Sequence, residues 1–499
     1  MDNGRASNSV RGSWRTRPSH GGRSLGQFSA TDTLGRGRAS NSVQGSWRSR
    51  PSHGGLSLGR GSTWHRSRAQ VPSETIDTTP FGRLVTNITL DDASSFITKT
   101  DSPKISDCKY IASYSLMKAS TQKIIIPGQP ATWTPLELPS RLPGDQGEYL
   151  RDQNGARFPD YPMQPSVQSI FALNKEFDPS SVDILGCASS LGDILRFVRS
   201  VDLTFRFDVE IIGDTLFLVR NHRNQVIPDV RGYGHSFLNA FLTHGAELQE
   251  TVSHQRIVSY SFGGLKCLVR YECDGHFSGS EEKSKATAGE KKVSGFPKFP
   301  ASNSITMEPA GNVIPQESIL EVKTKSQARD PIDMAEHLPR LWLRQIPSLI
   351  TAYHRAGNFE DVQEKVVRED LLKWESDHEL ELRKFASILR QLIIEVKRAS
   401  HLKLELCRTG LGPLELREQS EKPREALPNE WREMWTEQRR EPTRDSKSYL
   451  SDDEDGEGSY PDYLSSKDWS DESYDFDDDV ALDYTACDVE CGYCGRCDY

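Results

Sequence analysis

The sequence has no long hydrophobic run, although it is 499 residues long. No stretch approaches the roughly 18 consecutive apolar residues that a membrane-spanning helix needs. The first residues carry Arg and Ser where a signal peptide has its apolar segment. We therefore expect no membrane partner and no secretory leader. Hydrophobic residues make up only 35% of the chain, which predicts that long segments stay outside any packed core.

Cysteine is scarce along most of the chain and gathers at its end. Of the nine cysteines, an odd number, four lie in the last thirteen residues. Neither the number nor the spacing is typical of the disulfide framework of a secreted protein. We therefore expect a reducing, intracellular location, nuclear or cytoplasmic.

The terminal cysteines follow the spacing C-x3-C-x2-C-x2-C and are Cys487, Cys491, Cys494 and Cys497. Thiolates at this density favour Zn²⁺, so residues 487–499 form a candidate zinc site. Four ligands within eleven residues are crowded, and a site shared between chains is an alternative. An iron–sulfur cluster and a thiol tail without metal are two others.

Lysine is absent from residues 1–70, which carry twelve Arg against two Asp, a net charge of +10. Residues 451–499 carry seventeen acidic residues against two basic ones, a net charge of −15. Such asymmetry predicts a basic arm and an acidic tail on one folded unit. The expected parts are a disordered arm at 1–77, a globular domain at 78–440 with a mobile insertion at 276–316, an acidic disordered tail at 441–486, and the cysteine-rich end.

The basic arm contains a duplication, because the segment that begins at Gly4 recurs from Gly37 with three differences. Its unit has too few apolar residues to bury a face, so it does not predict a solenoid. The arginines could contact nucleic-acid phosphates while Trp14 and Trp47 stack on bases. A solvated arm without a dedicated partner is the alternative. The acidic tail could bind basic segments or other proteins.

Strand and helix patterns alternate through the globular range. Residues 205–221 alternate around a turn at Gly213, which predicts a hairpin. Residues 318–367 have the order strand, helix, strand, strand, and a strand–helix–strand run of this length is a βαβ unit. Residues 377–398 place apolar side chains at helical spacing. We therefore predict an α/β fold with a mixed sheet flanked by helices.

Two acidic residues interrupt the strand pattern of LVRYECDG. Glu272 and Asp274 are two residues apart, so on a strand they project from one face with their stems about 7 Å apart. In LEVKT, Glu321 and Lys323 share a face in the same way. If the two strands are neighbours, three carboxylates and one ammonium converge. Such a group can hold Mg²⁺ or Mn²⁺ and polarise a phosphoryl oxygen.

A purely structural role is the alternative for these residues. Glu272 and Asp274 would then end a strand at the solvent edge, and Glu321 and Lys323 would form an exposed cross-strand pair.

The pattern E-x-D followed by E-x-K resembles the PD-(D/E)XK nuclease superfamily, and most of all its decapping-nuclease branch, which acts on RNA 5′ ends. The resemblance spans about residues 180–410 and implies a nuclease-like core. It implies metal ligands at Glu272, Asp274 and Glu321. It also implies a cation facing water or phosphate at Lys323 and an accessory Gln345, which follows a Trp-containing helix.

The same branch uses an upstream acidic residue, for which Glu247 and Glu250 are candidates. It also has a guanidine-bearing motif, for which the candidates are Arg196, Arg206 and Arg256.

A second resemblance rests on the segments GYGHSF, SHQRIVSYSFGGLKCLVRYECDG and ACDVECGYCGRCDY. These are similar to a group of uncharacterised fungal proteins often labelled geranylgeranyl pyrophosphate synthetase. That label implies DDxxD motifs on the helices of an all-helical bundle. The sequence LDDASSF at Asp91 lacks the second acidic position, and the strand patterns contradict an all-helical fold.

These patterns together predict metal-dependent hydrolysis of nucleic-acid phosphodiester bonds, with RNA favoured. The alternative is a catalytically inactive interaction protein that keeps a nuclease fold. A prenyl diphosphate synthase is disfavoured.

Overall fold

The computed structural model describes residues 81–95, 102–118, 122–220, 226–227, 230–278, 304–327, 332–419 and 425–437. They belong to one compact unit, Gln70–Tyr499. The predicted basic arm, the acidic tail and the candidate zinc site at Cys487, Cys491, Cys494 and Cys497 lie outside the described residues.

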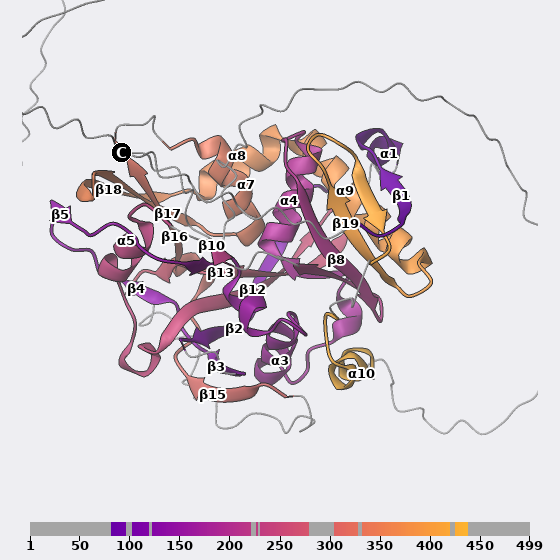
Figure 1. Ribbon diagram of the computed structural model, residues 1–499, viewed down its shortest axis with the longest axis horizontal. Helices are drawn as coiled ribbons and strands as arrows, with labels where there is room; N and C mark the ends of the chain where they lie inside the picture. The colour runs from indigo at the N-terminus through magenta and orange to yellow at the C-terminus, as the bar shows by residue number, and fades with distance from the viewer. Residues whose placement is uncertain are drawn as a thin grey trace, which may run out of the picture. The chain divides into compact units, whose positions relative to one another are not determined.

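The described strands form two large mixed sheets and one small sheet (Figure 1). The order across the eleven-stranded sheet is β1 (Leu84–Ile88), β20 (Leu414–Arg417), β19 (Lys403–Arg408), β8 (Phe205–Ile212), β9 (Thr215–Arg220), β7 (Ile184–Cys187), β13 (Leu265–Glu272), β12 (Thr251–Phe262), β2 (Ile105–Met117), β3 (Lys123–Pro127) and β15 (Thr306–Ala310). The order across the seven-stranded sheet is β11 (Leu242–Thr243), β4 (Ala131–Trp133), β14 (Gly275–His276), β16 (Ile319–Ser326), β17 (Ser348–Arg355), β18 (Asn358–Val366) and β5 (Ser140–Arg141). The small sheet pairs β10 (Val226–Ile227) with β6 (Tyr149–Leu150).

The helices of the described residues lie between these strands along the chain, except α10, which follows the last strand. They are α1 (Leu90–Ser95), α2 (Gln153–Arg157), α3 (Gln164–Leu173), α4 (Ala188–Val198), α5 (Gly234–Phe241), α7 (Met334–Arg344), α8 (Arg368–Asp377), α9 (Glu379–Arg398) and α10 (Asn429–Glu437). Three short 3₁₀ turns are η1 (Pro179–Ser181), η2 (Ala246–Leu248) and η3 (Gln316–Ser318).

The predicted α/β class with a mixed sheet and flanking helices is confirmed. Strands β8 and β9 form the hairpin predicted around Gly213, which has φ +62°. Strands β16 and β17 are parallel and are joined through α7, as expected of a βαβ unit. The helix predicted over 377–398 is α9, which begins two residues later, at Glu379.

Helices cover both faces of the eleven-stranded sheet, and the side chains of each strand point alternately to one face and to the other. On β9, Leu216 and Leu218 pack into a core with α4, α7, α8 and α9, whereas Phe217 and Val219 pack into a second core with α3 and α10. A third core lies under α5 in the seven-stranded sheet. Such two-sided burial explains the continuous apolar sequence of β9, which shows no polar alternation.

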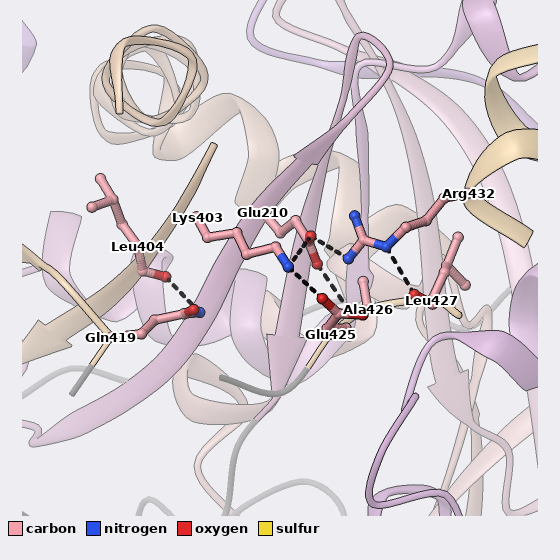
Figure 2. Close-up of polar contacts among 8 residues, drawn as sticks. All are labelled: Glu210, Lys403, Leu404, Gln419, Glu425, Ala426, Leu427 and Arg432. Atoms are coloured by element: carbon pink, nitrogen blue, oxygen red, sulfur yellow. Dashed lines mark hydrogen bonds and ion pairs between the residues drawn. The ribbon is translucent and has the colours of Figure 1, made fainter. Parts of the chain in front are cut away.

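A buried ion cluster attaches the last described segment to the sheet (Figure 2). Glu210 of β8 is 2% exposed and accepts a hydrogen bond from the Ala426 backbone at 2.9 Å. Its carboxylate also pairs with Arg432 of α10 and lies 3.2 Å from the Lys403 ammonium. Lys403 in turn contacts Glu425 at 2.8 Å. We call these four charged side chains the Glu210 cluster; it fixes residues 425–432 across β8 and β19.

The structure places a strand inside the range of the predicted insertion, 276–316. Strand β15 pairs in parallel with β3, from Thr306 opposite Lys123 to Ala310 opposite Pro127. Among the described helices, none has the length and apolar character required to cross a membrane. The two large sheets are incompatible with the all-helical bundle that the prenyl synthetase label implies.

Candidate active site at the crossing between the two sheets

The acidic segment of LVRYECDG lies where the chain passes from one large sheet to the other. Strand β13 of the eleven-stranded sheet ends at Glu272, and β14 of the seven-stranded sheet begins at Gly275. The expectation that Glu272 and Asp274 share one face of a single strand is therefore wrong. The chain crosses between sheets at Cys273, whose backbone N–H donates to the carbonyl of His254.

Gly275 permits this crossing. A Cβ atom at this position would lie 2.7 Å from Leu242 Cδ2 and 3.0 Å from the Ala131 carbonyl oxygen, so β14 can pair with β4 only without a side chain.

The crossing brings Asp274 against the strand that carries Glu321. Strand β14 pairs antiparallel with β16, with Gly275 opposite Leu320. The backbone N–H of Val322 donates to Asp274 Oδ2 at 2.8 Å. Asp274 and Glu321 therefore lie side by side, with β14 rather than β13 as the neighbouring strand.

Glu321 is buried and holds two cations. Its exposed fraction is 3%, and Lys323 Nζ lies 2.7 Å from Oε1, so the two side chains share a face of β16 as predicted. Arg344, the last residue of α7, donates from Nη1 to Oε2 at 2.8 Å. The alternative of an exposed cross-strand pair is wrong, because Glu321 and Lys323 lie on one strand, with Glu321 buried and Lys323 half-buried.

The carboxylates perturb one another. Burial, and to a lesser extent the charge of Asp274, raises the pKa of Glu272 to about 7. Burial and then the Glu321 charge raise the pKa of Asp274 above its ordinary value. Burial alone would also raise the pKa of Glu321, but Lys323 and Arg344 lower it below its ordinary value. Glu321 thus keeps its charge, whereas Asp274 and Glu272 gain from any further cation.

Gln345 lies next to this group without contacting its carboxylates in any described hydrogen bond. It caps α7 in the left-handed conformation with φ 53°, and its side-chain amide donates to the Trp342 carbonyl at 2.7 Å. The preceding residue, Arg344, makes the contact with Glu321 instead. Sequence reasoning missed Arg344 because which of the two residues faces the site depends on where α7 ends.

The candidate upstream acids lie elsewhere. Glu247 belongs to η2, and Glu250 faces Lys118 in an exposed pair at 3.9 Å. Besides Asp274, the acid whose charge raises the pKa of Glu272 is Asp152, which is 4% exposed and caps α2 by accepting the N–H groups of Asn154 and Gly155. Its only sequence signal is an ordinary helix cap.

The three candidate arginines lie in different surroundings. Arg206 pairs with Glu405 through two contacts of 2.8 Å. Arg256 donates to the side chain of Gln316 and to the Ile314 carbonyl. Arg196 pairs with Asp193 on α4, in a hollow that also contains Arg344.

The carboxylate oxygens of this group are suitable ligands for a divalent cation, although they do not form a complete metal cage. Among the described residues, no three Asp, Glu, His or Cys side chains are arranged as a ready metal cage. Mg²⁺ does not require such a cage, since it is commonly held by one or two carboxylates with water and substrate oxygens in the remaining positions. Asp274 and Glu321 supply two adjoining carboxylates, and Glu272 supplies a third whose raised pKa favours a nearby positive charge.

The chain matches the model of one protein family over residues 87–404; the family is described as "Domain of unknown function (DUF8563)". No curated protein matches the sequence.

Solved structures resemble the chain at low identity. Rai1 of S. pombe in complex with 3′-FADP is 13% identical with a TM-score of 0.42, over 67% of this chain and 99% of that one. Rai1 of Scheffersomyces stipitis in complex with (3′-NADP)⁺ and calcium ion is 11% identical with a TM-score of 0.44, over 72% and 100%. Rai1 of Candida albicans in complex with pU5-Mn²⁺ is 9% identical with a TM-score of 0.40, over 72% and 100%.

At these identities and TM-scores the likeness says nothing of activity, so we base the function below on the residues of this chain. Neither the family description nor these three structures carries the geranylgeranyl pyrophosphate synthetase label.

Proposed function

The chain belongs to the DUF8563 family, whose description leaves its activity open, and from its own residues we propose that it hydrolyses nucleic-acid phosphodiester bonds with the help of a divalent metal. The observation that carries this proposal is the group of three neighbouring carboxylates at the sheet crossing, with one ammonium beside them. RNA is the favoured substrate.

The charge of the group supports the proposal. Lys323, Arg344 and Arg340 act on Glu321, and Arg157 acts on Glu272. Burial and the neighbouring acids nevertheless raise the pKa of Glu272 and of Asp274. A fold that needed only stability gains nothing from a buried acid beside a like charge, because the repulsion costs free energy. Raised carboxylate pKa values grouped in this way are typical of functional sites.

Each residue has a distinct role in the proposed site. A bound Mg²⁺ or Mn²⁺ would polarise the scissile phosphoryl group and lower the pKa of water. Asp274 and Glu321 would hold the cation, with Glu272 as the third ligand. Lys323 would orient the attacking water or neutralise charge on the phosphoryl oxygens. Arg344 would position the Glu321 carboxylate, and we assign to it the accessory place predicted for Gln345.

Cleavage assays on the full chain test the proposal. We expect a 5′-labelled single-stranded RNA to be cut in the presence of Mg²⁺ or Mn²⁺ and not in EDTA. Asp274→Asn should lose this cleavage. Glu360→Gln, a matched control on the exposed side of β18, should keep it. Failure of the wild-type chain to cleave RNA or DNA with either metal would refute the proposed chemistry.

A second candidate is a non-catalytic protein that keeps the same group of residues. The favouring observation is that both oxygens of Glu321 already have a cation at hydrogen-bonding distance, Lys323 at 2.7 Å and Arg344 at 2.8 Å. In that case the wild type would bind RNA without cutting it, and Asp274→Asn would leave binding unchanged. The cysteine-rich end stays a candidate Zn²⁺ site, to be tested by metal analysis of the purified chain and of a Cys494→Ser variant.

A further inference from the structure

A hollow lined by four arginines lies beside the candidate site, between helices α4 and α7, which pack against each other (Figure 1). It encloses about 420 Å³ of empty space, including its open mouth. The arginines are Arg196 from α4, Arg199 directly after the end of α4, and Arg340 and Arg344 from α7. We call this feature the arginine hollow. Its single acidic lining residue is Glu336.

Arg344 connects the arginine hollow to the carboxylates. It is 2% exposed and lines the hollow, while its Nη1 donates to Glu321. Among the described residues, its Nε has no hydrogen-bond partner. A buried N–H without a partner is unfavourable, so an acceptor that reached it from the hollow would be favoured.

Arg196 and Arg199 each keep N–H donors that their ion pairs do not use. Arg196 contacts Asp193 at 2.9 Å, and Arg199 contacts Glu381 of α9 at 3.6 Å. A guanidinium carries five N–H donors in a planar fork, so one ion pair holds the side chain in place and leaves others for a second acceptor. Their acid partners thus preorganise the hollow before a ligand arrives. Recognition then depends on directed N–H groups more than on net charge.

The start of α4 adds backbone donors to the same hollow. Ala188 and Ser189, in its first turn, belong to the lining. Within the described chain, Cys187 at the N-cap provides no side-chain cap for these N–H groups. The N-terminus of an eleven-residue helix favours an anion through these groups and the helix dipole.

We propose that the arginine hollow binds a phosphate group of a single-stranded RNA, one that neighbours the phosphodiester at Glu321. This inference rests on the proposed function for the identity of the strand. Planar guanidinium donors and a helix N-terminus match the oxygens of a phosphate better than a base, which favours sequence-independent binding of the backbone. Arg344 couples the two positions, since one guanidinium serves both the hollow and Glu321.

Binding without catalysis tests the arginine hollow. Fluorescence anisotropy of a fluorescein-labelled oligouridylate with the full chain is measured in EDTA over a series of KCl concentrations. Each phosphate contact contributes about 0.7 to the slope of log Kobs against log [KCl] for single strands. We expect Arg196→Gln and Arg199→Gln each to reduce the slope by up to this amount and to weaken binding at low salt. Arg383→Gln removes an arginine of the same kind from α9, paired with Glu379, and should change neither.

A second variant separates recognition from folding. Arg199→Lys keeps the charge but cannot hold a phosphate with two parallel bonds, so we expect an unchanged slope with weaker binding. Wild-type slopes in both glutamine variants, or wild-type affinity in Arg199→Lys, would overturn the proposal. Because EDTA removes the metal, the binding experiment does not depend on cleavage. A wild type that never cleaves RNA refutes only the proposed function. A salt slope that stays unchanged in the Arg196→Gln and Arg199→Gln variants refutes only phosphate binding by the arginine hollow.

Discussion

Two nearly fully buried glutamates, Glu210 and Glu321, lie in different sheets with different neighbours. Glu210 is 2% exposed and Glu321 is 3% exposed, and each holds two cations. The Glu210 cluster is balanced, because Glu210 and Glu425 face Lys403 and Arg432 (Figure 2). Glu321 lies instead beside Asp274. Lys323 and Arg344, and to a lesser extent Arg340, lower the pKa of Glu321, whereas the pKa values of Asp274 and Glu272 are raised.

The difference separates a structural ion cluster from a candidate functional one. A buried charge is tolerated when opposite charges and hydrogen bonds satisfy it, which the Glu210 cluster achieves with a backbone N–H and two cations. Asp274 accepts the Val322 N–H, and Glu272 has a hydrogen bond with Ser253. Burial, and then the charge of a neighbouring acid, nevertheless raises the pKa of both carboxyl groups. Grouped acids with raised pKa values are typical of functional sites, where a cation or a substrate completes them.

The largest expected effect is on catalysis at the Glu321 site. Lys323→Met removes the ammonium 2.7 Å from Glu321. We expect kcat for RNA cleavage to fall about 10²–10³-fold, the usual effect of losing one group that stabilises developing charge. The matched control is Lys365→Met, which breaks an exposed pair with Asp370 and should cleave like the wild type. Equal rates in the two variants would contradict the role given to Lys323.

Breaking the Glu210 cluster should affect stability alone. Glu210→Gln leaves Arg432 without its carboxylate and Lys403 with Glu425 alone, and each cation is about one-fifth exposed. The expected loss in free energy of unfolding is about 2–3 kcal/mol, below the usual cost for a fully buried pair because water reaches both cations. Urea unfolding measures it, with Glu425→Gln as the more exposed comparison. If the folded Glu210→Gln variant lost RNA cleavage, the purely structural role given to Glu210 would be wrong.

Added Mg²⁺ should stabilise the protein through the carboxylates at Glu321 and not through the Glu210 cluster. At a Mg²⁺ concentration of 100 Kd, we expect the wild type to gain about 2.7 kcal/mol in free energy of unfolding. Asp274→Asn should lose this gain, because it removes one proposed ligand. Glu210→Gln should keep it. The measurement is a melting curve with and without Mg²⁺, and a gain of equal size in Asp274→Asn would exclude the Asp274 site.

A half-buried histidine, His235, adds a pH-dependent effect on stability to the comparison. Burial lowers the pKa of His235 to about 4, and its ring stacks on Tyr149 with centroids 3.6 Å apart. Between about pH 6.5 and pH 4 the unfolded chain binds a proton that the folded chain excludes, so stability falls as pH decreases, by up to about 1.4 kcal/mol per pH unit. His235→Gln should flatten this fall in urea titrations. The exposed His401→Gln should not.

Local pattern was sufficient to predict most of the elements near the site. Helical spacing identified α9, and the alternation around Gly213 identified the β8–β9 hairpin. The side-by-side placement of Glu321 and Lys323 followed from the two-residue period of a strand. These are properties of neighbours in sequence.

Features set by distant segments could not be predicted in this way. The crossing at Cys273 depends on how the two sheets meet. Arg344 reaches Glu321 only because Gln345 adopts φ 53° and ends α7. Asp152 affects Glu272 from a helix cap more than 100 residues earlier in the sequence. No short sequence window contains both members of such a pair.

The crossing at Gly275 also bears on how this protein could change during evolution. Asp274 is fixed through β13 on one side and through β14 on the other, so the spacing of the carboxylates depends on the packing of both sheets. A substitution deep in either core that shifts one sheet would alter the site without touching it. Core residues of both sheets therefore help to set the position of Asp274 relative to Glu321.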